Sequence, residues 1–114
     1  MKSNNLINTI YLEQKFEEID IILKLITNSI KVCNALNTTM DILRLKKQKM
    51  DLVLKRIVFT KLMLKNNARA CDVTKMLNIN HSTIQYYISR ELKYDNKLSE
   101  LYYKTKKKLN DLQT

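Results

Sequence analysis

The sequence contains neither glycine nor proline, and it has one histidine and two cysteines among 114 residues. Without glycine, the phosphate-binding loops of nucleotide enzymes are excluded, because their backbone approaches the phosphates only at glycine. One histidine and two scattered cysteines make no zinc-binding pattern. No paired acid and base, and no nucleophile beside a base, suggests catalysis. We therefore expect no enzyme activity, no cofactor, no metal and no small-molecule substrate.

Glycine and proline are also the residues that most often mark the turns between strands. Few segments alternate apolar and polar residues, whereas apolar residues three and four positions apart recur along the chain. This spacing is typical of amphipathic helices. We predict an all-α protein, a small helical bundle of one domain.

No apolar run approaches the roughly 20 residues that a membrane-spanning helix needs. The first twenty residues include four acidic ones, unlike a secretory signal peptide. These features predict a cytoplasmic protein with no membrane partner. Cysteines stay reduced in that compartment, so Cys33 and Cys71 are predicted to be small buried apolar residues.

The formal net charge of +10 is unevenly distributed. Basic and acidic residues balance in residues 1–45, so residues 46–114 carry the whole excess. A basic part joined to a neutral part is typical of a module that binds a polyanion. A lysine-rich solvated surface would explain the same composition, so charge alone does not choose between the two interpretations.

Residues 1–30 are predicted to form an amphipathic helical extension of the main domain. Additional apolar residues make its stripe wider than one contact face needs, so the helix is either buried on two sides or meets a partner chain. That partner could be a second copy in a homo-oligomer. The alternative function, a helical interaction or virion assembly protein, rests on this segment. The stripe consists of Phe16, Ile19, Leu23, Ile26, Ile30 and Cys33.

The most apolar segment, residues 52–64, is predicted to be the central helix, with Arg56 among the basic residues that point outward. Two short helices follow, over residues 70–77 and 81–92. Asn78 is expected to take the left-handed conformation in the turn between them, and Asn80 to cap the second helix. That helix should turn Ile84, Ile88 and Leu92 to the core, with Tyr87 beside them. The residues that then face the solvent or a groove are His81, Ser82, Gln85, Tyr86 and Ser89.

The segment Asn80-His-Ser-Thr-Ile84 resembles the Asp-His-(Ser/Thr)-Thr-Val signature of the C-terminal DNA-binding domain of the bacterial replication initiator DnaA. Val32–Leu43 is similar to the opening helix of that family and its Asp-Leu-Leu element. Lys46–Lys49 falls at the basic loop of the family, and Arg56 falls where an arginine begins the long central helix. The similarity extends from about Ile30 to Leu92, and the family's ATPase domain is missing.

The resemblance implies a Trp-repressor-like helix-turn-helix over residues 31–114. It implies a sequence-specific protein that binds double-stranded DNA at a replication origin or a regulatory site, in a bacterium or a phage-infected cell. Helix 81–92 would enter the major groove, and segment 46–49 would contact phosphates or the minor groove. The implied base contacts are Asn80, His81, Ser82 and Thr83, joined by Gln85 on the same outward side. The implied backbone contacts are Lys46, Lys47, Lys49, Arg56, Lys65 and Lys75.

Two positions depart from the family pattern. Asn80 replaces the aspartate of the signature, and Lys47 stands where the family inserts an arginine into the minor groove. A carboxylate can only accept hydrogen bonds, whereas the amide of Asn80 can also donate them. Lysine fits a narrow groove less well than arginine does. We expect the preferred DNA sequence to differ from that of the family.

Overall fold

The computed structural model describes the backbone of residues 2–113 and the side chains of residues 7–111. Within these residues the chain forms six α-helices, one short 3₁₀ helix and no strand, which confirms the predicted all-α class. The helices are α1 (Lys2–Ala35), α2 (Met40–Leu43), α3 (Met50–Lys65), α4 (Ala70–Leu77), α5 (His81–Ser89), the 3₁₀ helix η1 (Leu92–Tyr94) and α6 (Asn96–Gln113).

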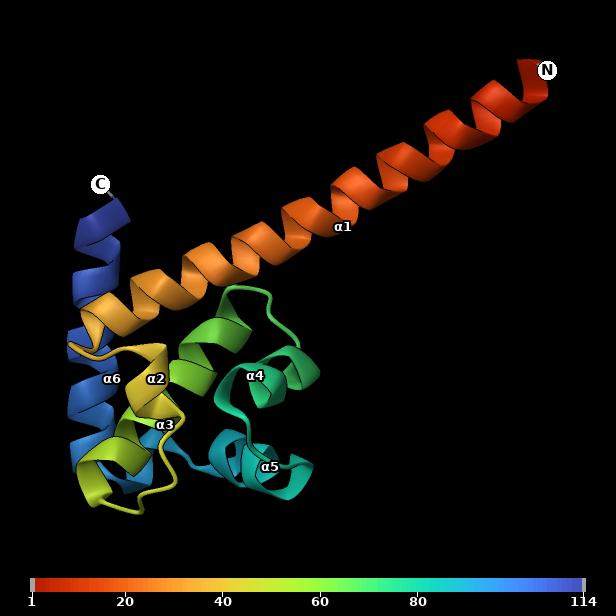
Figure 1. Cartoon of the computed structure of the whole chain (residues 1–114). Helices are drawn as coiled ribbons and strands as arrows, with labels where there is room; N and C mark the ends of the chain where they lie inside the picture. The colour runs from red at the N-terminus through yellow and green to blue at the C-terminus, as the bar shows by residue number, and fades with distance from the viewer. Residues whose placement is uncertain (1, 114) are drawn as a thin grey trace.

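Helix α3 is the centre of the bundle, as its apolar sequence predicts. The end of α1 and the helices α4, α5 and α6 all pack against it (Figure 1). Each large apolar side chain that is buried in this way stabilises the fold by about 1.5–3 kcal/mol. The side chains of α3 that are almost completely buried are Ile57, Val58, Phe59, Leu62 and Met63.

Helix α1 has two parts with different surroundings. Its last turns pack on α3 and α6, whereas its first half runs away from the bundle as an isolated rod (Figure 1). A helix of this length measures roughly 50 Å at 1.5 Å per residue, most of the 63 Å longest dimension of the molecule. The extension predicted for residues 1–30 is helical from Lys2, the first described residue, and the helix continues without a break to Ala35.

Three helices end at an asparagine in the left-handed conformation: Asn37 after α1, Asn67 after α3 and Asn78 after α4. Asparagine enters this region more easily than other residues with a side chain, so the chain makes these turns without glycine. The predicted conformation of Asn78 is thus confirmed. In each turn the next N–H donates to the carbonyl five residues earlier: Thr38 to Cys33 at 3.0 Å, Ala68 to Met63 at 3.0 Å, and Ile79 to Thr74 at 3.1 Å.

The two cysteines have different environments. Cys33 is buried, its Sγ lies 3.5 Å from Sδ of Met40, and burial raises the pKa of its thiol to about 11. Cys71 is exposed, so the prediction of a buried residue is wrong there. Its side chain lies on the solvent face of α4 because Val73 and Leu77 occupy the inner face. Among the described residues, no three histidine, cysteine or acidic side chains come together as a metal site.

None of the helices in the described part of the chain is both long and apolar enough to cross a membrane.

Candidate nucleic-acid interface

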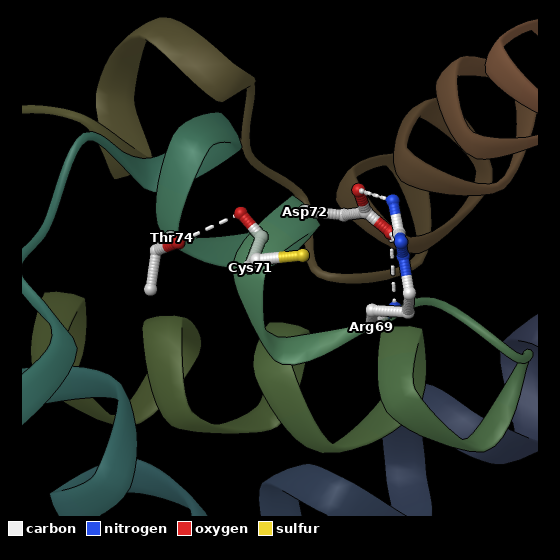
Figure 2. A network of polar contacts seen from close by, with 4 residues as sticks. All are labelled: Arg69, Cys71, Asp72 and Thr74. Atoms are coloured by element: carbon white, nitrogen blue, oxygen red, sulfur yellow. Dashed lines mark hydrogen bonds and ion pairs between the residues drawn. The ribbon is translucent and has the colours of Figure 1, made fainter.

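Helix α4 begins with a network of polar contacts between Arg69 and Asp72 (Figure 2). The Asp72 carboxylate accepts hydrogen bonds from the backbone N–H of Arg69 at 3.1 Å and from its guanidinium Nε at 3.2 Å. The hydrogen bond from the Arg69 side chain is the main cause that lowers the pKa of Asp72. A carboxylate in the first turn also interacts favourably with the helix dipole. The start of α4 is therefore held in place locally.

The turn from α4 to α5 places the first turn of α5 at the surface. After Asn78, the chain extends through Ile79 to Asn80, whose side-chain oxygen accepts from the Thr83 backbone N–H at 2.8 Å. The predicted cap is thus confirmed. The backbone N–H groups of His81 and Ser82, at the start of the helix, have no carbonyl of a preceding turn to bond. They form the positive end of the helix dipole.

Helix α5 has one buried side and one polar side. Ile84 and Tyr87 are buried, and Thr83 is half-buried. Ile88 is 37% exposed, so the prediction that it faces the core is wrong, whereas the inner position predicted for Tyr87 is confirmed. The exposed polar side chains, as predicted, are those of His81, Ser82, Gln85, Tyr86 and Ser89.

Helix α5 ends at Ser89, three residues earlier than predicted. The backbone of Arg90 is extended, with φ −67° and ψ 117°, and its guanidinium donates to the Tyr86 hydroxyl at 2.6 Å and to the Asp95 carboxylate. These contacts direct the chain away from the helix axis. Leu92 consequently lies in η1 and not in α5.

The predicted basic segment is an exposed loop between α2 and α3. We call residues 44–49 the basic loop; Lys46, Lys47 and Lys49 are all exposed in it. Its first residue, Arg44, donates from Nε to the Met76 carbonyl at 2.6 Å, which ties the loop to the last turn of α4.

Arg56 holds the basic loop from beneath. Its Nε donates to the Leu43 carbonyl at 2.8 Å and its Nη1 to the Lys47 carbonyl at 3.0 Å. The side chain is only 4% exposed, so the prediction that it points outward is wrong. Its donors are used to satisfy loop carbonyls that would otherwise be buried without partners. In this conformation Arg56 positions the loop and does not present its charge to a phosphate.

The basic loop and the start of α5 line a common groove. Lys46 and Gln48 form one wall, and Asn80 and Thr83 form the other. An adjoining hollow continues from Gln48 to Ser82 and Tyr86. The structure therefore brings together two segments that the sequence separates by more than thirty residues.

The two remaining lysines of the predicted set differ in position. Lys75 is exposed in the last turn of α4. Lys65 lies at the end of α3, where its proximity lowers the pKa of Lys106 on α6. That end of α3 is roughly 22 Å along the helix from the basic loop. Lys65 is thus outside the groove.

Two residues at this surface were missed from the sequence, Gln48 and Arg90. Gln48 lines the groove beside Tyr86, whose exposure was predicted, and the Arg90 guanidinium lies 5.6 Å from the Tyr86 ring centre. The hydrogen bond to Tyr86 is the main cause that raises the pKa of Arg90. The spacing of Ser82, Tyr86 and Arg90, four residues apart, is the signal that could have indicated this side.

No family model, no curated protein and no solved structure matches this chain. Its function is therefore to be inferred from the residues of the groove, their charge and their exposure.

Proposed function

We propose that the chain is a sequence-specific double-stranded-DNA-binding protein, a replication-origin or transcription-regulatory factor. In this proposal α4 and α5 act as a helix-turn-helix of the DnaA C-terminal type, and the chain catalyses no reaction. The observation that carries the proposal is the groove that Lys46 and Gln48 of the basic loop share with the polar start of α5.

The exposed side of α5 has the chemistry needed to recognise base edges. The major groove is about 12 Å wide and admits one helix, and its base edges offer hydrogen-bond donors and acceptors. His81, Ser82 and Gln85 are exposed and carry both kinds of group. A glutamine can pair with adenine through two hydrogen bonds, so Gln85 is our candidate for such a contact. Asn80 and Thr83 lie at the wall of the groove and complete the set of base contacts.

The basic loop would bind the DNA backbone beside that helix. Lys46, Lys47 and Lys49 are exposed on a loop that Arg56 and Arg44 already hold, so little backbone conformational entropy is lost when they bind. Phosphate contacts fix the position of a protein along the duplex but do not select a sequence. Lysines of the loop therefore contribute affinity, with Lys75 as a further phosphate contact, and the exposed side of α5 contributes specificity.

A first experiment determines whether the chain selects a DNA sequence. The intact chain is used to select duplexes from a random pool, and fluorescence anisotropy then compares the enriched duplex with a shuffled one. We expect His81→Ala to weaken the enriched duplex by about 1–3 kcal/mol and to leave the shuffled duplex unaffected. Absence of binding to any duplex at about 50 mM salt would refute the proposal.

A second experiment tests the basic loop. The triple variant K46Q/K47Q/K49Q is compared with K97Q/K104Q/K107Q, which removes the same charge from exposed positions of α6. We expect the loop variant to weaken all duplexes and to reduce the salt dependence, because each lost phosphate contact lowers the slope by about 0.9. Equal losses in both variants would show that net charge, and not the loop, drives binding.

The exposed apolar residues of α1 favour a second candidate function, a helical interaction or assembly protein in which α4 and α5 only pack. In that case the α1 surface would be required for assembly, and neither lysine triple would change any binding property. The anisotropy experiments distinguish the two functions directly.

A further inference from the structure

Helix α1, including its projecting part, carries large apolar side chains that remain exposed to solvent. Each of them is 47–67% exposed. A monomeric protein seldom exposes a continuous apolar area larger than a few hundred Å². The residues are Ile7, Ile10, Tyr11, Leu12, Phe16, Ile19, Ile21, Ile22, Leu23, Ile26 and Ile30.

Six of these residues form a seam with the spacing of a coiled coil. They follow each other at steps of four and three residues, which is the heptad pattern of apolar a and d positions. Over three heptads this spacing favours two or more helices that wind around each other. We call this set the α1 seam: Leu12, Ile19 and Ile26 at d, and Phe16, Leu23 and Ile30 at a.

The α1 seam lies away from the bundle. The buried residues of α1, which are Ser29, Val32, Cys33 and Ala35, mark the side that faces α3 and α6. At about 100° per residue, the seam is turned roughly 120° from that side. A second helix can therefore lie along the seam without displacing any helix of the bundle.

We propose that α1 associates with the α1 of a second copy of this chain, side by side in parallel, as a coiled coil. The charges beside the seam support the parallel direction. In a parallel pair Lys15, at g, faces Asp20 of the second copy, at e, and the contact forms twice. In an antiparallel pair the e positions face each other. Glu13 and Asp20 are at e positions and carry the same negative charge, which does not favour that arrangement. Within one chain Lys15 pairs with Glu18 and also lies 5.5 Å from the Tyr11 ring centre, and Asp20 pairs with Lys24; both ion pairs are exposed.

The area available is sufficient for a stable interface. Residues 7–30 extend over roughly 36 Å, and burying about half of a cylinder 10 Å wide on each of two copies removes on the order of 1,100 Å² from water. This exceeds the roughly 1,000 Å² that a biological interface needs. The charges beside the seam favour the parallel direction, and Leu23 at a with isoleucine at d also accommodates further parallel copies.

The mass of the intact chain in solution tests the association, without any DNA. We expect sedimentation equilibrium at micromolar concentration to give at least twice the 13.5 kDa of one chain. Leu23→Glu should produce a monomer, whereas Ile21→Glu, at an equally exposed position off the seam, should not. A monomeric parent chain, or equal dissociation of both variants, would overturn the inference. So would a monomer that binds vesicles containing phosphatidylglycerol, since it would assign the seam to lipid.

Disulfide cross-linking tests the direction. In a Cys71→Ser background, which removes the exposed thiol, we expect mild oxidation of Leu12→Cys to yield a covalent dimer. Two d positions face each other only in a parallel pair; an antiparallel pair on this seam would separate them by roughly 27 Å. Ile21→Cys, outside the seam, is the matched control. Cross-linking of the control but not of Leu12→Cys would overturn the parallel arrangement.

This inference does not rest on DNA binding. A chain that associates but binds no duplex would retain the coiled coil and lose only the proposed function.

Discussion

Arg56 is the single residue on which the shape of the basic loop depends most. Its side chain is buried, and its two hydrogen bonds go to the carbonyl of Leu43, just before the loop, and to that of Lys47, within it. A buried charge is tolerated only when its donors are satisfied, and here the loop supplies the acceptors. The arginine and the loop therefore stabilise each other.

Replacing Arg56 by methionine should lower the free energy of unfolding by about 1.5–3 kcal/mol, the contribution of hydrogen bonds from a charged donor. Methionine keeps the apolar stem but leaves both carbonyls without their partner. Urea unfolding followed by circular dichroism measures the change. Lys55→Met, at the neighbouring and half-buried position of α3, is the control. An Arg56→Met variant as stable as that control would contradict the structural role.

At the scale of elements, the helices are terminated by local signals. Asn80 caps α5, because its side-chain oxygen accepts from the Thr83 backbone N–H at 2.8 Å. Thr39 caps α2 in the same way, by accepting from the Ile42 backbone N–H at 3.3 Å. Asn78 ends α4 with φ 54°. These signals act within a few residues of the chain. The sequence alone was therefore sufficient to predict the left-handed Asn78 and the cap at Asn80.

Asn78→Ala should destabilise the fold by about 1–2 kcal/mol, since an ordinary side chain is strained in the left-handed region. Asn78→Gly should change stability much less. Glycine enters that region without strain, and this gain offsets the larger entropy that it loses on folding. Urea unfolding of both variants tests this. Equal destabilisation by alanine and glycine would show that the amide, and not the backbone conformation, is what matters.

The start of α4 should make stability depend on acid pH. The pKa of Asp72 is lowered below its usual 3.8 in the folded chain, so the folded state favours the ionised carboxylate. Its contribution is complete above the unfolded value and is lost as the pH falls through the lower folded value. We expect Asp72→Asn to reduce the loss of stability on acidification below about pH 4.

Urea midpoints measured through that acidic range provide the test. Arg69→Gln, which removes the hydrogen bond that lowers the pKa, should reduce the acid dependence in the same way. If Asp72→Asn kept the full acid dependence of the parent chain, another carboxylate would be responsible.

At the scale of the whole molecule, the parallel α1 pair and the DNA-binding groove make a joint prediction. A parallel pair carries both bundles at the same end, so two α5 helices can contact one duplex. We expect a duplex with two copies of the selected sequence spaced by about one helical turn, 10–10.5 base pairs, to bind more tightly than one spaced by half a turn.

Fluorescence anisotropy with the two spacings measures this preference. Leu23→Glu should abolish the preference while a single copy of the sequence is still bound. If spacing had no effect on the parent chain, the two bundles would not bind one duplex together.

The sequence alone was sufficient for the all-α class, the central position of α3, the left-handed Asn78 and the Asn80 cap. These features depend on periodicity and on interactions within a few residues. The exposed polar side of α5 was predicted for the same reason. The seam of α1 is also present in the sequence, but only the structure shows that the bundle leaves it uncovered.

The remaining features were decided by contacts between distant parts of the chain. Arg56 was expected outside, but carbonyls at positions 43 and 47 keep it buried. Helix α5 ends early where Arg90 bonds to Asp95, and Ile88, expected in the core, is exposed. The groove itself exists because packing on α3 brings the basic loop to the start of α5. Periodicity shows which side of a helix is apolar, but only tertiary packing decides which residues at its edge are covered.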